Sequence, residues 1–338
     1  MKSFRKEKLL VRLFAIFFLL RAYTSFAQAI REEDKLMASL NFGSSLPAGL
    51  LSMRSIALYE NIYTEAELQE IQKYFQQAGI DAVSYMDIDY VLSGPEPARI
   101  FSTYFNSRNI KFFVLLQKKD NEYQIVFTEY NGTKSFVDKT HTSWKLSDAS
   151  LSELLRSIYR FAVSTQKKEN FLINDIPETG VFLNFFKGKQ DERFSPDIRL
   201  FKSAIPRWGN EADDKELEAF LKENFKAKYE LVDPELTDAE LEEKGYRMVL
   251  RFVHTRGDVA RDILGYDVTQ TTSSLSTNYV IDNVPGIKTI PSKKIIYKFY
   301  FKNTEYGNIF LGNKWDADET WQDALRNHIL SLRLDQKF

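Results

Sequence analysis

The residues best suited to chemistry gather in one short stretch of this sequence. His254 begins the run His-Thr-Arg-Gly-Asp at the end of a predicted strand, the edge where open α/β sheets commonly place a site. Asp258 and Asp262 follow four residues apart on a predicted helix, so their carboxylates can share one face. Together with His254 they could approach a cation or position a general base. We predict a binding site, without a catalytic residue, at His254, Arg256, Asp258 and Asp262.

The same stretch also has a purely structural interpretation, which the pattern favours. An acid in the first turn of a helix complements the positive end of the helix dipole. Asp258 would then serve only the helix, with Arg256 and Arg261 as partners of the acids at the surface. On this interpretation the stretch holds no metal and no cofactor.

Other candidate residues fall on single elements. Asp87 and Asp89 would lie on one face of a predicted strand over residues 82–92, and paired acids suit glycoside hydrolysis or a metal. Acidic strand ends are common, however, and no third group lies nearby in the sequence. The turn 93–96 leads into a predicted helix whose free amides could hold an anion, although its proline removes donors. His328 falls on an apolar helical face, which indicates a packed core histidine.

The amino-acid composition excludes several classes of catalytic and metal-binding site. The sequence contains no cysteine, which excludes disulfides, thiolate catalysis, cysteine-ligated zinc and iron–sulfur clusters. It also contains no glycine-rich phosphate loop, Gly-x-Ser-x-Gly elbow, His-Glu-x-x-His helix or EF-hand spacing. The 27 Phe and 17 Tyr instead indicate aromatic-rich cores that can hold the chain together without disulfides.

The first 27 residues have the order of a secretory signal peptide. A basic segment over residues 2–12 precedes an apolar run over residues 13–20, and Ser25 and Ala27 place small residues before a cleavage point. The apolar run is shorter than the roughly 20 residues that cross a bilayer, so we expect no transmembrane span after cleavage. We predict export to the bacterial periplasm or beyond. An uncleaved membrane anchor is the alternative.

The net charge of the chain limits the classes of molecule that it is expected to bind. The full chain carries a net charge of −1, and removal of the basic leader makes the remainder more acidic. A mildly acidic surface argues against binding to nucleic acids or to anionic membranes. We therefore expect a protein of the bacterial envelope, and no nucleic acid, as the partner. The pattern leaves the oligomeric state open.

Hydrophobic periodicity and helix caps predict one α/β unit that occurs twice. Residues 28–50 form an arm, and residues 51–165 and 198–338 each follow the order β-α-β-α-β-β-β-α. Trp144 and Trp315 occupy matching places before the last helix of each unit. We expect each Trp to seat that helix on its sheet.

Two segments depart from the predicted repeat. Residues 166–197 are too apolar for a loose linker and predict a hairpin that bridges the units. Residues 256–293 form an insertion in the second unit, and its polar core over residues 269–277 is expected to be mobile. Long insertions tend to be functional or disordered, so we expect any function specific to one unit to lie there.

The predicted element order implies a mixed sheet in each unit. Connections through helices give parallel neighbouring strands, whereas hairpins add antiparallel ones. This order is similar to that of the N-terminal domain of periplasmic TolB-type proteins. The similarity lies in the order of elements alone, without a shared motif, so it implies a fold and no functional residue.

A duplicated unit without a catalytic constellation in either copy favours a binding role. We expect an exported, non-enzymatic envelope protein that acts as a protein-binding or scaffold module. One alternative is a secreted metal-dependent hydrolase that uses His254, Asp258 and Asp262. The other is a small-ligand or sugar binder with its site in the cleft between the units.

Overall fold

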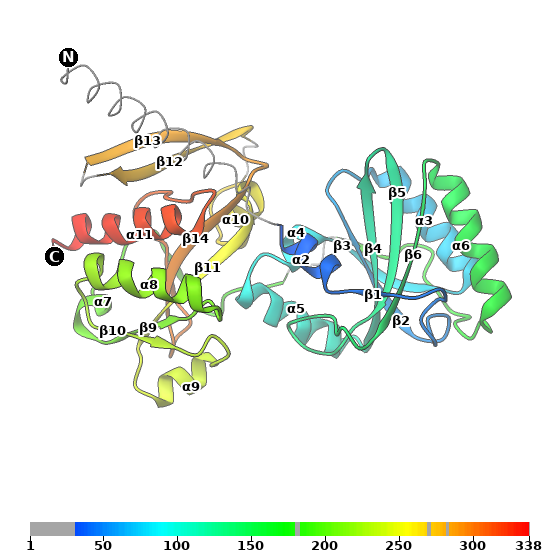
Figure 1. Ribbon diagram of the computed structural model, residues 1–338, viewed down its shortest axis with the longest axis horizontal. Coiled ribbons are helices and arrows are strands. Elements are labelled where there is room, and N and C mark those ends of the chain that lie inside the picture. The colour runs from blue at the N-terminus through cyan, green and yellow to red at the C-terminus, as the bar shows by residue number, and fades with distance from the viewer. Residues whose placement is uncertain (1–30, 180–182, 269–271, 282–283, 338) are drawn as a thin grey trace, which may run out of the picture. The chain divides into compact units, whose positions relative to one another are not determined.

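Two mixed β-sheets organise the protein. The computed structural model describes all residues except 1–30, 180–182, 269–271, 282–283 and 338 (Figure 1). The predicted signal peptide, residues 1–27, therefore lies outside the described residues. Within the described part of the chain, no helix is long and apolar enough to cross a membrane. The mixed α/β class predicted from the sequence is confirmed.

The first sheet has a parallel centre and an antiparallel flank. Its strands, in the order in which they lie side by side, are β1 (Asn41–Phe42), β6 (Thr142–Asp148), β5 (Glu122–Glu129), β4 (Ile110–Lys119), β2 (Arg54–Tyr59), β3 (Asp81–Asp87) and β7 (Glu178–Thr179). β2 pairs in parallel with both β3 and β4. The pairs β4–β5 and β5–β6 are antiparallel.

Strand alternation explains why helices cover both faces of the first sheet. The helices are α2 (Glu32–Ala38), α3 (Glu65–Ala78), α4 (Ile88–Val91), α5 (Pro95–Ser107) and α6 (Leu151–Thr165). On β2, Ala57 faces the core of α3 and α6, whereas Ile56 and Leu58 face the core of α2 and α5. α3 begins at a capping box, in which Thr64 and Glu67 exchange hydrogen bonds with each other's backbone N–H. α3 and α6 lie side by side (Figure 1).

The second sheet has the same mixture of strand directions. Its strands in spatial order are β10 (Tyr229–Val232), β9 (Ser203–Pro206), β11 (Met248–Arg256), β14 (Ile295–Asn303), β15 (Ile309–Phe310) and β8 (Gln190–Asp191). β9 pairs in parallel with both β10 and β11. The pairs β11–β14 and β14–β15 are antiparallel.

Helices also cover both faces of the second sheet. They are α7 (Asp197–Leu200), α8 (Glu211–Asn224), α9 (Asp238–Glu243), α10 (Gly257–Ile263) and α11 (Trp321–Gln336). On β11, Leu250 belongs to the core of α8 and α11, whereas Val249 and Val253 face the cores of α9 and α10. A second capping box, formed by Thr237 and Glu240, begins α9.

His328 is a buried core residue of α11, as the sequence predicted. Its Nδ1 lies 2.9 Å from the carboxylate of Asp316, and the Lys298 ammonium lies 2.7 Å from the same carboxylate. Burial acts to raise the pKa of Asp316, but the charges of Lys298 and His328 lower it overall. The three groups therefore compensate one another inside the second sheet's core.

The segments before and after the first unit contribute short elements to the sheets. In the described part of the predicted arm, residues 31–50, α2 packs Leu36 into the core and β1 pairs with β6. Among the described residues of the segment 166–197, β7 pairs with β3 and β8 pairs with β15. Each short strand extends an existing sheet, which satisfies backbone groups that a free hairpin would expose.

The predicted insertion, residues 256–293, contains an ordered antiparallel hairpin. β12 (Ser274–Ile281) pairs with β13 (Val284–Pro291), and β12 packs on α11 (Figure 1). Leu275 and Val280 of β12 are buried. The expected mobile core falls partly on residues 269–271, outside the described residues, and from Ser274 onward it is strand instead.

The two matching tryptophans have different roles. Trp144 stacks on Phe161 of α6 with ring centroids 5.0 Å apart, so it seats that helix as predicted. Trp315 packs against Tyr266, just after α10, at 5.2 Å, so the expectation for this residue is wrong. The reason is that Trp315 lies against the core of α10, whereas Trp321 begins α11 and contacts Trp208.

Candidate functional site

His254, the first of the predicted site residues, is packed inside the protein. Its ring stacks on Tyr297, its partner across the β11–β14 pair, with centroids 3.8 Å apart and planes inclined by 6°. Its Nδ1 lies 3.1 Å from the carboxylate of Glu32 on α2. Burial acts to raise the pKa of Glu32, but hydrogen bonds with His254 and Lys35 lower it overall. His254 thus joins β11 to α2.

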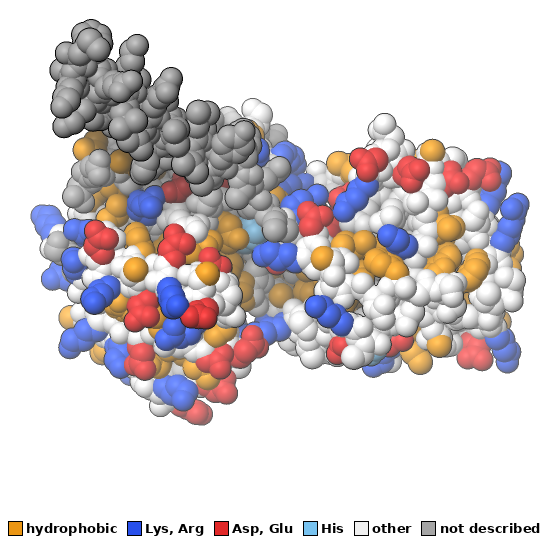
Figure 2. All heavy atoms as spheres, in the orientation of Figure 1, with side chains coloured by type: hydrophobic (Ala, Val, Ile, Leu, Met, Phe, Trp, Pro, Cys, Tyr) orange, Lys and Arg blue, Asp and Glu red, His pale blue; other side chains and the backbone are white. Residues whose placement is uncertain are grey.

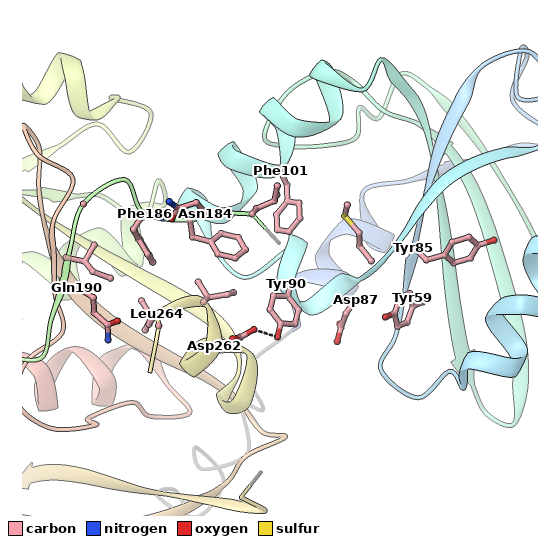
Figure 3. A pocket seen from close by; sticks show the side chains of 17 residues that line it. Tyr59, Tyr85, Asp87, Tyr90, Phe101, Asn184, Phe186, Gln190, Asp262 and Leu264 are labelled. Carbon is pink, nitrogen blue, oxygen red and sulfur yellow. Dashed lines mark hydrogen bonds between the residues drawn. The ribbon is translucent and has the colours of Figure 1, made fainter. Parts of the chain in front are cut away.

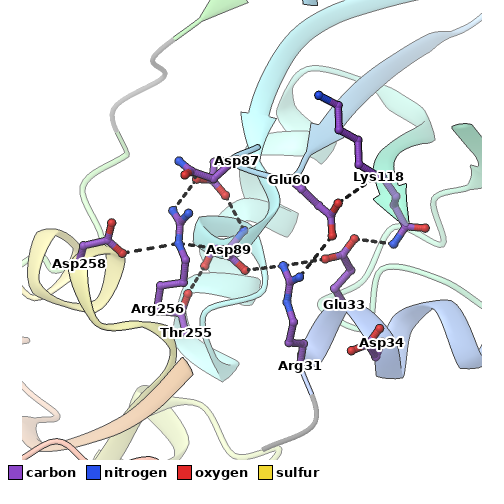
Figure 4. Close-up of polar contacts among 12 residues, drawn as sticks. Arg31, Glu33, Asp34, Glu60, Asp87, Asp89, Lys118, Thr255, Arg256 and Asp258 are labelled. Atoms are coloured by element: carbon purple, nitrogen blue, oxygen red, sulfur yellow. Dashed lines mark hydrogen bonds and ion pairs between the residues drawn. The ribbon is translucent and has the colours of Figure 1, made fainter. Parts of the chain in front are cut away.

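The guanidinium of Arg256 lies between the carboxylates of Asp87 and Asp89, which are two residues apart in the chain. Its Nη2 lies 2.8 Å from Asp87 and its Nε lies 3.0 Å from Asp89 (Figure 4). Asp87 ends β3 and accepts a hydrogen bond from the Asp89 N–H at 2.9 Å, which turns the chain into α4. The predicted strand over residues 82–92 therefore ends early, and the two acids serve a cap and an ion pair.

Arg31 is the second cation of this network. It lies 2.9 Å from Glu33, 3.3 Å from Glu60 and 3.4 Å from Asp89 (Figure 4). Gln117 donates a hydrogen bond to Glu33 at 2.6 Å. Burial and the neighbouring Glu60 raise the pKa of Glu33 to about 7. Buried acids repel one another, so the two guanidinium groups are what allows them to gather here.

The network lies at the carboxyl ends of the parallel strands of the first sheet. Glu60 follows β2, Asp87 ends β3 and Gln117 lies near the end of β4. β2 leads to α3 on one face and β3 leads to α5 on the other, an arrangement that opens a crevice in α/β sheets. Here the side chains of Arg31 and Arg256 pair with the acids of that edge, so its charged groups already have partners.

Asp258 and Asp262 share α10 but have different partners. The Asp258 carboxylate lies 2.7 Å from the Lys293 ammonium, and the Tyr90 hydroxyl donates a hydrogen bond to Asp262 at 2.6 Å. Neither acid contacts His254, so these described residues do not converge on one ligand. In the part of the chain that the structure describes, no group of three or more His, Asp or Glu side chains is placed to hold a metal ion.

The turn 93–96 is occupied by the protein's own groups. Glu96 is buried on α5 and forms an ion pair with Lys302 of β14, and Arg251 of β11 lies 3.8 Å from it. The Ser93 carbonyl accepts a hydrogen bond from a backbone N–H of β11 at 2.7 Å. The Glu96 carboxylate therefore already pairs with the cations, Lys302 and Arg251, that a bound anion would need.

Asp262 lies at the edge of a cavity that sequence reasoning missed (Figure 3). The cavity has a volume of about 530 Å³ and lies among the end of β3, α4, α5, α10 and residues 183–190. Six aromatic side chains of the described residues line it: Tyr59, Tyr85, Tyr90, Phe101, Phe185 and Phe186. Its polar lining consists of Asp87, Asn184, Gln190 and Asp262. This volume and this composition are usual for small-molecule sites.

No sequence motif predicts this cavity, and its position in the fold explains why. Its lining comes from segments far apart in the sequence, which only the fold brings together. The one available signal was the apolar run over residues 181–186, which is unusual for a connection between two sheets. Of the four predicted site residues, only Asp262 lines this cavity; His254 lines a different one, of about 570 Å³.

Comparison with known proteins does not assign the chain to a family. No model of a protein family matches the sequence, and no curated protein matches it. Its function therefore has to be inferred from the cavity and the surface.

Proposed function

We propose that this chain is an exported, non-enzymatic binding protein that takes a small, partly apolar ligand in the cavity beside α10. The observation that carries the proposal is the cavity itself, with aromatic rings around it and a few polar groups that can orient a ligand. Export is supported by the signal-like leader over residues 1–27 and agrees with a chain that lacks cysteine.

The charged groups near the cavity support binding better than catalysis. General acid–base catalysis needs a group that can exchange protons with the bound molecule. Asp87 is held by Arg256, and Asp262 accepts the Tyr90 hydroxyl. The alternative of a metal-dependent hydrolase has little support, because His254 contacts Glu32 and Asp258 contacts Lys293 instead of converging on one metal ion.

Ligand binding can be tested by filling the cavity. Thermal unfolding of the full chain is measured with compounds that join an aromatic body to one polar group. A ligand present at 100 times its Kd stabilises the folded state by about 2.7 kcal/mol. We expect Asn184→Trp to abolish this stabilisation, because the indole would occupy the cavity from its exposed edge.

The matched control is Asn184→Ala, which removes the same amide without filling space. It should keep the stabilisation. If no compound stabilises the wild type, or if Asn184→Trp still binds as tightly, the cavity is not the ligand site.

A second candidate function is protein binding through the outer edge of β13. Among the described residues no strand pairs with this edge, and an open strand edge can accept an extended segment of another protein. Ile287 of β13 is 71% exposed, and Val284 of the same strand and its cross-strand partner Ile281 are also exposed. On the face drawn in Figure 2, acidic and basic side chains are interspersed, which suits a protein partner better than a nucleic acid. We propose an extended, apolar segment of an envelope protein as the partner.

Ile287→Lys tests this candidate. The substitution should leave the melting temperature unchanged, because the side chain is exposed, and should abolish co-purification of the partner from an envelope fraction. Ile176→Lys is the matched control, since Ile176 is 84% exposed in a different segment. A partner that is retained by Ile287→Lys, or lost equally with both variants, would rule out the β13 edge.

We further propose that the two sheets descend from one duplicated unit. The neighbour orders β3-β2-β4-β5-β6 and β10-β9-β11-β14-β15 support this, because parallel and antiparallel pairs fall in the same places. The likeness in element order to the N-terminal domain of TolB-type proteins belongs to the same proposal about ancestry. It brings no functional residue to this chain.

A further inference from the structure

The cavity beside α10 has an uneven balance of charge. Two carboxylates, Asp87 and Asp262, line it, and no Lys, Arg or His is among the described residues that do so. Arg256 approaches Asp87 from outside the lining and compensates it at 2.8 Å. Asp262 is exposed, accepts the Tyr90 hydroxyl and has no ion pair with the described residues. One negative charge at the edge of the cavity is therefore left without a cation.

The rings of the cavity favour a positive charge in the same place. The face of an aromatic ring attracts a cation within about 6 Å of its centre. Figure 3 shows Tyr90 beside Asp262, with Phe101 and Phe186 further along the lining. A ligand could therefore place a cationic group near Asp262 and Tyr90 and an apolar body against the phenylalanines.

An anionic ligand does not fit this lining. A carboxylate or phosphate would meet two carboxylates and, among the residues that the structure describes, no lining cation, and like charges brought together in a site are unfavourable. A neutral ligand would pack against the rings but would leave the charge of Asp262 without a cation.

We infer that the cavity binds an organic cation, an amine or quaternary ammonium group attached to an apolar body. This inference rests on the proposed ligand-binding function and names its ligand class. The carboxylate of Asp262 and the ring of Tyr90 receive the cation. Asp262 is thus a binding residue and takes part in no chemical step.

Three probes with one aromatic body and different charges test the inference. They are 2-phenylethylammonium, 2-phenylethanol and 3-phenylpropionate, each titrated calorimetrically into the full chain. We expect the ammonium compound to bind at least tenfold more tightly than the alcohol and the carboxylate not to bind at about 1 mM. Added salt should weaken the ammonium compound selectively, because it screens an exposed charge.

Asp262→Asn should remove the tenfold preference for the cation and leave the affinity for the alcohol unchanged. Asp258→Asn is the matched control, because it removes an acid of the same helix that does not line the cavity. It should preserve the preference. Equal or tighter binding of the alcohol or the carboxylate to the wild type would overturn the cation class while ligand binding survives. If none of the three probes binds, both the class and the proposed function fail.

Discussion

Glu33 shows how a single buried carboxyl group can make stability depend on pH. Its side chain is 4% exposed, and burial together with Glu60 raises its pKa to about 7. A carboxyl group with a raised pKa binds its proton more tightly in the folded than in the unfolded state. Its contribution therefore favours the folded state at low pH and is lost as pH rises from about 4.5 through about 7.

Glu33→Gln should therefore stabilise the protein at pH 8.5 and change little at pH 4.5. Glutamine keeps the shape and the bond to Gln117 but carries no charge. The gain at high pH should approach about 3 kcal/mol, since one pKa unit corresponds to about 1.4 kcal/mol. Urea unfolding at both pH values measures it. Glu122→Gln, at an exposed position, is the control, and an equal effect at both pH values would contradict the raised pKa.

At the scale of elements, the capping box of α3 has a measurable effect on stability. The Thr64 hydroxyl accepts a hydrogen bond from the Glu67 N–H, and the Glu67 carboxylate accepts one from the Thr64 N–H at 2.7 Å. Thr64→Ala removes one of these bonds and should lower the free energy of unfolding by about 1 kcal/mol. Denaturant titration measures the loss.

Thr103→Ala is the matched control for this element. Thr103 is exposed inside α5, where its hydroxyl donates to the Arg99 carbonyl, and alanine is the better helix former at such a position. The control should be neutral or slightly stabilising. If both substitutions have the same effect, the cap contributes nothing beyond helix propensity.

At the scale of the whole molecule, Arg256 connects the second sheet to α4. Its partner Asp89 is buried and its partner Asp87 is mostly buried, so removal of the guanidinium would leave Asp87 without a cation and Asp89 with Arg31 alone. Arg256→Met should therefore lower the free energy of unfolding by about 3–5 kcal/mol. Adding Asp87→Asn and Asp89→Asn to this variant should recover most of the loss, because no buried charge then lacks a partner.

Lys293→Met provides the comparison for Arg256. Lys293 also pairs with an acid, Asp258, but its side chain is 62% exposed. Exposed pairs are worth about 0–1 kcal/mol, so its removal should have little effect. A loss below 1 kcal/mol for Arg256→Met would mean that the buried network does not hold these elements together.

Local signals in the sequence were sufficient for much of the fold. Helix caps and the packed His328 were predicted because each depends on residues within one or two turns, and the structure has capping boxes at Thr64 and Thr237 and a buried His328. The mixed α/β class follows from the same periodicity. The sheet edges that β7 and β8 join were not evident from the sequence, because local pattern does not reveal the partner of a strand.

The site depended on contacts between distant parts of the chain. Arg256 and Asp87 are 169 residues apart, and Tyr90 and Asp262 are 172 apart. Residue type and spacing marked Asp262 and His254 as candidates, but only the tertiary structure put one at a cavity and the other against Glu32. Sequence alone determined the helices and their caps, because these depend on hydrogen bonds between residues close together in the chain. The packing of two sheets decided the cavity, because its lining comes from both.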